Sequence, residues 1–191
     1  MNHCKRAYET TIQMLLHPAE GWNSIRHNAT IGGMLSEFLY PMTMLCGTAV
    51  VLGRLIRGGI SFATIYDSLI DAAMYSLSLL AAYHFATVAI KFLTERQTKE
   101  SVDKEAVAIF TGYSMTVILA LEICVGLFPI LRLPALVAQF YTLKIVRDGA
   151  VAIWGIEKEQ LFAYAVTVTI ILIALPMVTS RILNYLTLTL N

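Results

Sequence analysis

The stretch QFYTLKIVRDGAVAIWG, residues Gln139 to Gly155, decides the fold because it places Lys144, Arg147 and Asp148 within a strongly apolar region. It is either a loop between two membrane segments or one membrane helix that carries three charges. Read as a loop, it leaves only the ten residues from 134 to 143 before the charges, about 15 Å of helix, too short for a bilayer core of about 30 Å. Read as one helix, residues 134–156 are long enough to span.

Two further features of residues 134–156 bear on the single-helix interpretation, one in favour and one against. Lys144 and Asp148 are four residues apart, so a helix places them on one face, where they can pair. Asp148 is followed by a glycine, and this dipeptide favours turns. A glycine inside a helix costs only about 1 kcal/mol, however, and glycines are common in membrane spans. We therefore predict one continuous helix.

The composition is that of an integral membrane protein. Of the 191 residues, 57% are hydrophobic and 14% are charged, whereas soluble domains have roughly 25% charged residues. The formal net charge of +1 gives no reason to expect a nucleic-acid partner. Cys4, Cys46 and Cys124 lack the spacing of a disulfide framework or a metal site. The first thirty residues lack the apolar core of a signal peptide, so we expect the first span to act as the insertion signal.

Apolar runs along the chain predict an all-α fold, an integral membrane bundle of five transmembrane helices preceded by one or two amphipathic interfacial helices. The expected membrane domain is 34–186, with spans at about 35–56, 70–91, 106–129, 134–156 and 160–182. Outside it we expect a cytosolic amphipathic region at 1–33, a cytosolic charged loop at 92–105 and an external tail at 187–191.

Two features predict how the chain sits in the membrane. Basic residues near the spans favour a cytosolic N-terminus and an external C-terminus. With that orientation the cytosolic side has eight basic residues (Lys5, Arg6, Arg26, Lys91, Arg96, Lys99, Lys104, Lys158) and the external side has four (Arg54, Arg57, Arg132, Arg181).

Before the first span, Tyr8, Ile12, Leu15 and Leu16 recur at helical spacing. We expect this region to lie in the cytosolic interface with Trp22 as its anchor; a disordered tail is the alternative.

Several short motifs resemble one family. They are LLHPAEGWNSIR at 15–26, EFLYP at 37–41, GYS at 112–114, and QFYTLKIVRDG followed by IEKEQLFAYAV. Together they resemble bacterial members of the Yip family, the Ypt/Rab-interacting five-span membrane proteins, over about residues 15–186. The family-motif positions are Glu37, Tyr40, Pro41, Gly112 and Tyr113.

The resemblance implies the same orientation as the basic residues do, and in a bacterium it implies the inner (cytoplasmic) membrane. In eukaryotes the family implies roles in vesicle traffic and association with small GTPases. EFLYP here lacks the glycine of the family's first signature, and GYS lacks the proline that usually follows.

Charges at membrane depth are candidates for function because each costs about 2.5–3.5 kcal/mol to insert. At about 1.5 Å of rise per residue, Lys144 falls near the middle of the bilayer and Glu122 about 10 Å from the external end of its span. Six polar residues are therefore expected to form a buried cluster: Glu122, Lys144, Arg147 and Asp148, with His84 and Gln139 as further members.

Three interpretations of this cluster stay open. In the first it is a self-neutralised structural knot, in which Lys144 pairs with Glu122 or Asp148 and fixes helix register. In the second it lines a cavity that binds a proton, an ion or a lipid headgroup. In the third the fourth helix is broken, and its charges lie beside phospholipid phosphates.

The sequence offers no catalytic residue, metal site or cofactor motif. It has no HExxH helix, no GxSxG elbow and no Walker loop, and its four histidines are not spaced as metal ligands. We therefore predict a non-enzymatic protein of the Yip family, acting in membrane organisation or as an adaptor. Besides the lipid bilayer, a cytosolic or membrane protein is expected as partner through 1–33 and 92–105, and a homo-oligomer is compatible with the sequence. The alternative is a small transporter or channel-like protein that uses the buried cluster.

Overall fold

The computed structural model describes residues 3–190, and within this range every regular element is helical. In chain order the helices are α1 (His3–Leu16), α2 (Pro18–Asn28), α3 (Ile31–Met34), α4 (Tyr40–Gly58), α5 (Phe62–Thr98), α6 (Lys104–Ser114), α7 (Thr116–Leu127), α8 (Arg132–Ala138), α9 (Thr142–Trp154) and α10 (Lys158–Leu190). A π-helical turn at Leu35–Leu39 joins α3 to α4, and 3₁₀ turns at Pro129–Leu131 and Gln139–Tyr141 flank α8. The expected all-α class is confirmed.

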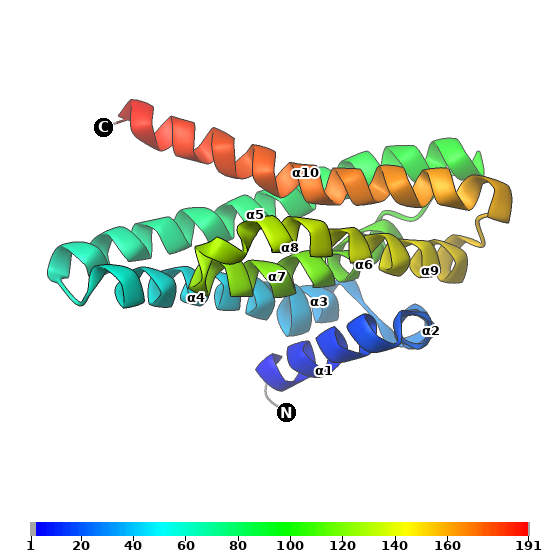
Figure 1. The fold of residues 1–191 in the computed structure, drawn as a ribbon. Helices are drawn as coiled ribbons and strands as arrows, with labels where there is room; N and C mark the ends of the chain where they lie inside the picture. The colour runs from blue at the N-terminus through cyan, green and yellow to red at the C-terminus, as the bar shows by residue number, and fades with distance from the viewer. Residues whose placement is uncertain (1–2, 191) are drawn as a thin grey trace.

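Five helical segments are long and apolar enough to cross a membrane, which confirms the expected number. They are Ile31–Gly58, Phe62–Thr98, Lys104–Leu127, Pro129–Trp154 and Lys158–Leu183. The second comprises 37 residues, about 55 Å of helix, which exceeds a bilayer core of about 30 Å. Figure 1 shows the consequence: the hairpin of α4 and α5 projects beyond the other helices.

The stretch that carries Lys144 to Asp148 belongs to one continuous helical segment. Helical structure runs without a gap from Pro129 to Trp154 and includes the 3₁₀ turn at Gln139–Tyr141. A 3₁₀ helix turns about 120° per residue and an α-helix about 100°, so this turn rotates α9 by about 60° relative to a straight α-helix. The segment ends at Gly155, whose φ of +61° suits a glycine.

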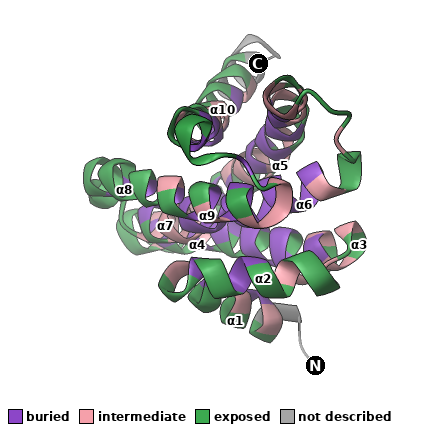
Figure 2. Cartoon of the chain, turned by 90° about the vertical axis from the view of Figure 1, so that its right-hand side faces the viewer, coloured by how far each residue is buried: buried purple, intermediate pink, exposed green. Residues whose placement is uncertain are grey.

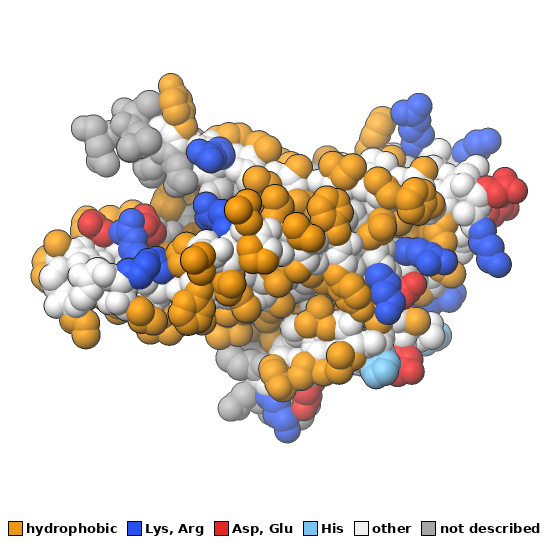
Figure 3. All heavy atoms as spheres, viewed as in Figure 1, with side chains coloured by type: hydrophobic (Ala, Val, Ile, Leu, Met, Phe, Trp, Pro, Cys, Tyr) orange, Lys and Arg blue, Asp and Glu red, His pale blue; other side chains and the backbone are white. Residues whose placement is uncertain are grey.

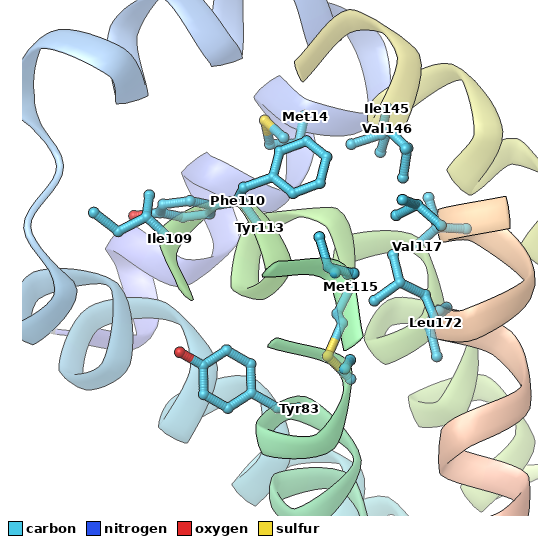
Figure 4. Packing of buried hydrophobic residues seen from close by; sticks show 14 of the residues in the cluster. Met14, Tyr83, Ile109, Phe110, Tyr113, Met115, Val117, Ile145, Val146 and Leu172 are labelled. Atoms are coloured by element: carbon cyan, nitrogen blue, oxygen red, sulfur yellow. The ribbon is translucent and has the colours of Figure 1, made fainter. Parts of the chain in front are cut away.

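The helices form three layers (Figure 2). α5 and α10 pack together on one side, α4, α6, α7, α8 and α9 lie in the middle, and α1 and α2 cover the opposite side. The third span, α6 with α7, is the most buried of the five. Its side chains meet those of neighbouring layers in the core, where Phe110, Met115, Ile145 and Leu172 are almost fully buried (Figure 4).

The amino-terminal helices pack against the bundle, α1 on the start of the first span and α2 on α9. Trp22 on α2 is 0% exposed, and its indole N–H donates to the carbonyl oxygen of Ile145 at 2.8 Å. Its ring also stacks on Phe110, with centroids 5.4 Å apart. The expectation that Trp22 anchors this region in the lipid interface is therefore wrong. The glycine at position 149 leaves room for the indole, so protein atoms rather than lipid surround it.

The expected loop at 92–105 and the expected tail at 187–191 are both largely helical. α5 continues to Thr98 and α6 begins at Lys104, so within 92–105 only residues 99–103 form the connection. Asp103 caps α6 by accepting the backbone N–H groups of Glu105 and Ala106 at 3.2 and 3.3 Å. Within the expected tail 187–191, residues 187–190 continue α10; residue 191 lies outside the described part, as do residues 1 and 2.

Candidate functional site

Of the six residues expected to form a buried cluster, the structure brings Glu122 and Gln139 together. The side-chain amide of Gln139 donates to Glu122 Oε1 at 3.2 Å. The hydroxyl of Tyr75, on α5, donates to Glu122 Oε2. The carboxylate on α7 is thus oriented by two neutral donors from neighbouring helices, and we refer to these three residues as the Glu122 triad.

Lys144 and Arg147 lie on the protein surface, and Asp148 is half-buried. Lys144 Nζ lies 3.4 Å from the hydroxyl of Tyr141 and 5.6 Å from the centroid of that ring. Among the described residues, no ion pair joins Lys144 to Glu122. The expected pairing of Lys144 with Glu122 is therefore corrected. Gln139 is the residue level with Glu122, and Lys144 lies five residues, about 7.5 Å, further along the segment.

His84 takes no part in the Glu122 triad. Its side chain is on the surface of α5, where its ring lies 5.0 Å from that of the adjacent Tyr83. The expectation of a buried position for His84 is therefore also corrected. Equal depth along a helix gives no information on which face a side chain occupies.

A cavity of about 300 Å³ opens beside the triad, between α5, α7, α8 and α10. We call it the Glu122 cavity. Tyr75, Glu122 and Gln139 supply polar atoms to its wall, and two arginines, Arg132 of α8 and Arg181 of α10, also line it. The remaining wall is largely apolar and includes Leu79, Ile118, Leu133, Leu136, Ile173, Pro176 and Met177. A cavity with one polar side and apolar walls suits an amphiphilic ligand.

The two arginines of the Glu122 cavity differ from two others at the same end of the bundle. Arg54 pairs with Asp71 at 2.5 Å, and Arg57 donates to the carbonyl oxygen of Leu127 at 3.2 Å. Within residues 3–190, neither Arg132 nor Arg181 has an acidic side chain within 4.0 Å. Their guanidinium groups therefore remain available to an anionic group of a ligand.

Tyr75, Arg132 and Arg181 belong to the site but were not predicted from the sequence. Tyr75 had a usable signal, because a tyrosine hydroxyl inside an apolar run needs a partner. Counted from the ends of the expected spans at 70 and 129, Tyr75 lies five residues in and Glu122 seven, so their depths are similar. The two arginines had no comparable signal, because basic residues at span ends are expected in any membrane protein.

Two of the family-motif positions, Gly112 and Tyr113, make packing contacts with the first span. Gly112 allows a close approach, since a Cβ atom there would lie 2.4 Å from Met34 Sδ. The ring of Tyr113 lies 5.0 Å from that of Phe38, which places the third span against the start of the first. Of the other motif positions, Glu37 forms an ion pair with Arg6, Pro41 is buried and Tyr40 is exposed.

No group of three or more His, Cys, Asp or Glu side chains suited to a metal ion occurs in the described part of the chain. Comparison of the chain with protein-family models, with curated proteins and with solved structures finds no match. The chemistry of the Glu122 cavity is therefore the basis for assigning a function.

Proposed function

We propose that this chain is a non-enzymatic multi-pass membrane protein that contributes to membrane organisation by holding a lipid molecule in the Glu122 cavity. One observation supports this proposal most directly. The cavity contains charged and hydrogen-bonding groups, and its apolar walls continue onto the outer surface of the protein. Leu133 on α8 and Met177 on α10 line the cavity and are themselves exposed. A lipid can place its headgroup on the polar groups and its chains along this apolar surface.

Lipid binding suits the geometry better than conduction through the bundle. Beyond the cavity, toward the opposite end of the bundle, Met115, Leu119 and Ile145 are almost fully buried and close-packed. A transported ion or proton would have to pass this apolar core, where an unpaired charge is costly. The transporter reading therefore has less support than a fixed binding site.

We further propose a bacterial inner-membrane location with a cytosolic N-terminus and an external C-terminus. The count of basic residues and the resemblance to the Yip family both support this orientation. Figure 3 shows a predominantly apolar middle, as expected of a protein that crosses a membrane, with charged side chains toward both ends of the bundle and a further group at its lower edge, on α1. In this orientation the Glu122 cavity opens in the external half of the bundle.

An adaptor role is a second candidate, favoured by one feature of α1. Ala7 and Met14 are buried on one side of this helix, while Tyr8, Ile12 and Leu16 remain exposed at successive turns on the other. A partner protein could cover this stripe. A pulldown in mild detergent tests the role: wild-type protein should capture a reproducible partner, and a variant with Tyr8→Ser and Ile12→Ser should lose it.

Lipid binding is tested by mass spectrometry of the intact protein released from mild detergent. Ser180 of α10 lines the cavity, so Ser180→Phe should fill it and remove the retained lipid. Ala174→Phe adds the same ring at an exposed position on the same helix and should leave the lipid in place. Melting temperatures of both variants establish that they are folded. The proposal fails if the wild-type protein retains no lipid, or if both folded variants retain as much as the wild type.

A further inference from the structure

We propose that the Glu122 cavity selects a zwitterionic phospholipid headgroup, with Glu122 binding the ammonium and Arg132 and Arg181 binding the phosphate. This inference rests on the proposed function, because it requires that the cavity holds a lipid. It goes further by naming the headgroup chemistry and the residue that recognises each charge.

Glu122 has spare capacity to accept hydrogen bonds from an ammonium group. Its two carboxylate oxygens together have about four acceptor sites, and Tyr75 and Gln139 occupy one on each oxygen. Both partners are neutral, and within the described residues no cationic side chain lies within 4.0 Å of the carboxylate. A primary ammonium would supply both the missing charge and further N–H donors.

Arg132 and Arg181 suit the phosphate of the same headgroup. They come from different helices and line the same cavity, and neither pairs with an acid in the part of the chain that is described. A guanidinium presents N–H groups in a planar fork that matches phosphate oxygens. Two such groups from two helices can hold one phosphate between them.

Opposite charges in one cavity exclude simpler headgroups. A headgroup with only negative charge would bind the arginines but would be repelled by Glu122 in a site of low dielectric. A headgroup with only positive charge would be repelled by the arginines in turn. Arg132 lies seven residues before Gln139 of the triad in the helical segment from Pro129 to Trp154, so its backbone is about 10 Å from that of Gln139 along the axis, and its long side chain lines the same cavity as Glu122. A headgroup that carries both charges on separate atoms satisfies both the carboxylate and the guanidinium groups.

The experiment is a competition in nanodiscs that contain equal parts of phosphatidylethanolamine, phosphatidylcholine and phosphatidylglycerol. Lipid retained by the protein after release is identified by mass spectrometry. The wild-type protein should retain about ten times more phosphatidylethanolamine than phosphatidylglycerol. It should also retain less phosphatidylcholine than phosphatidylethanolamine, because the quaternary ammonium of phosphatidylcholine has no N–H donor. Glu122→Gln should remove the preference for phosphatidylethanolamine. Arg132→Gln combined with Arg181→Gln should lower retention of all three phospholipids.

Matched controls use basic residues outside the cavity. Lys144→Gln and Arg147→Gln remove surface charges from α9 and should leave both retention and preference unchanged. If Glu122→Gln does not fold, the wild-type protein is given N-acetylated phosphatidylethanolamine, which lacks the ammonium and should bind about tenfold less than the parent lipid.

The outcomes separate this inference from the proposed function. If the wild-type protein retains no lipid, both fail. If lipid is retained and is lost in Ser180→Phe, but without preference among the three headgroups, lipid binding stands and the headgroup assignment is overturned. The assignment is also overturned if acetylation of the amine leaves retention unchanged, or if Lys144→Gln reduces binding as much as the arginine variants do.

Discussion

The indole ring of Trp22 lies directly against the backbone of Gly149. A Cβ atom at Gly149 would lie 2.5 Å from Cε2 of Trp22, closer than side-chain contacts allow. Through this contact and the hydrogen bond to Ile145, α2 is fixed to the fourth span. The glycine after Asp148 is therefore a site of close helix packing and does not mark a turn.

Gly149→Ala should destabilise the protein, because the indole fills the space that the new methyl group needs. Overpacking of this kind typically costs about 1–3 kcal/mol, or a fall in melting temperature of about 2–12 °C for a chain of this size. Thermal unfolding in detergent measures the change. In the control Gly32→Ala, the added Cβ atom would have no neighbour within 4 Å. Equal melting temperatures for the two variants would contradict the contact.

Gly53→Ala should cause a larger loss of stability. A Cβ atom there would lie 2.0 Å from the carbonyl oxygen of Gly126 and 3.0 Å from that of Leu127, so the backbones of α4 and α7 would have to separate. The cost should reach the upper end of the range for overpacking, about 3 kcal/mol. At Gly58, on the same helix, the nearest atom is a methyl carbon of Thr64 at 3.3 Å, so Gly58→Ala serves as the control. A wild-type melting temperature for Gly53→Ala would rule out this close approach.

Glu122 should be coupled energetically to Tyr75 and uncoupled from Lys144. Glu122→Leu leaves the tyrosine hydroxyl and the Gln139 amide without an acceptor, at about 1–3 kcal/mol each. A double-mutant cycle with Tyr75→Phe should give a coupling energy of about 0.5–3 kcal/mol. The corresponding cycle with Lys144→Met should give less than about 0.5 kcal/mol, as expected for distant sites. Unfolding in mixed micelles provides the free energies. Recovery of stability by Glu122→Lys together with Lys144→Glu would instead demonstrate a direct pair.

Membrane orientation can be tested with single cysteines in a background that lacks the three native ones. Ile60→Cys lies in the turn between α4 and α5, and Ser101→Cys lies in the connection between α5 and α6. An impermeant thiol reagent should label position 60 in intact bacterial cells and position 101 only after permeabilisation. The reverse pattern would place the N-terminus outside. Labelling of both positions in intact cells would mean that α5 does not cross the membrane.

The sequence was sufficient to predict the five spans and the continuity of the fourth, because both depend on length and apolar content. The side-chain partners needed information that a count of residues does not contain. Residue counts placed Lys144 within reach of Glu122, whereas in the structure Gln139 is level with Glu122 and Lys144 lies further along the segment. The rotation of each helix about its axis was also unknown. The 3₁₀ turn at Gln139–Tyr141 changes that rotation and has no clear sequence signal. The burial of Trp22 was likewise unpredictable, since an amphipathic helix has the same pattern whether its apolar side meets lipid or protein.

The projecting hairpin of α4 and α5 has a practical consequence for imaging this protein. At 21.2 kDa the chain offers little mass outside a detergent micelle from which particle orientation can be determined. Because both arms of the hairpin are helical up to the short connection at residues 59–61, a rigid helical domain could be fused in frame with both arms. Such a fusion would stand clear of the micelle as a fiducial marker and leave the cavity around Glu122 unmodified.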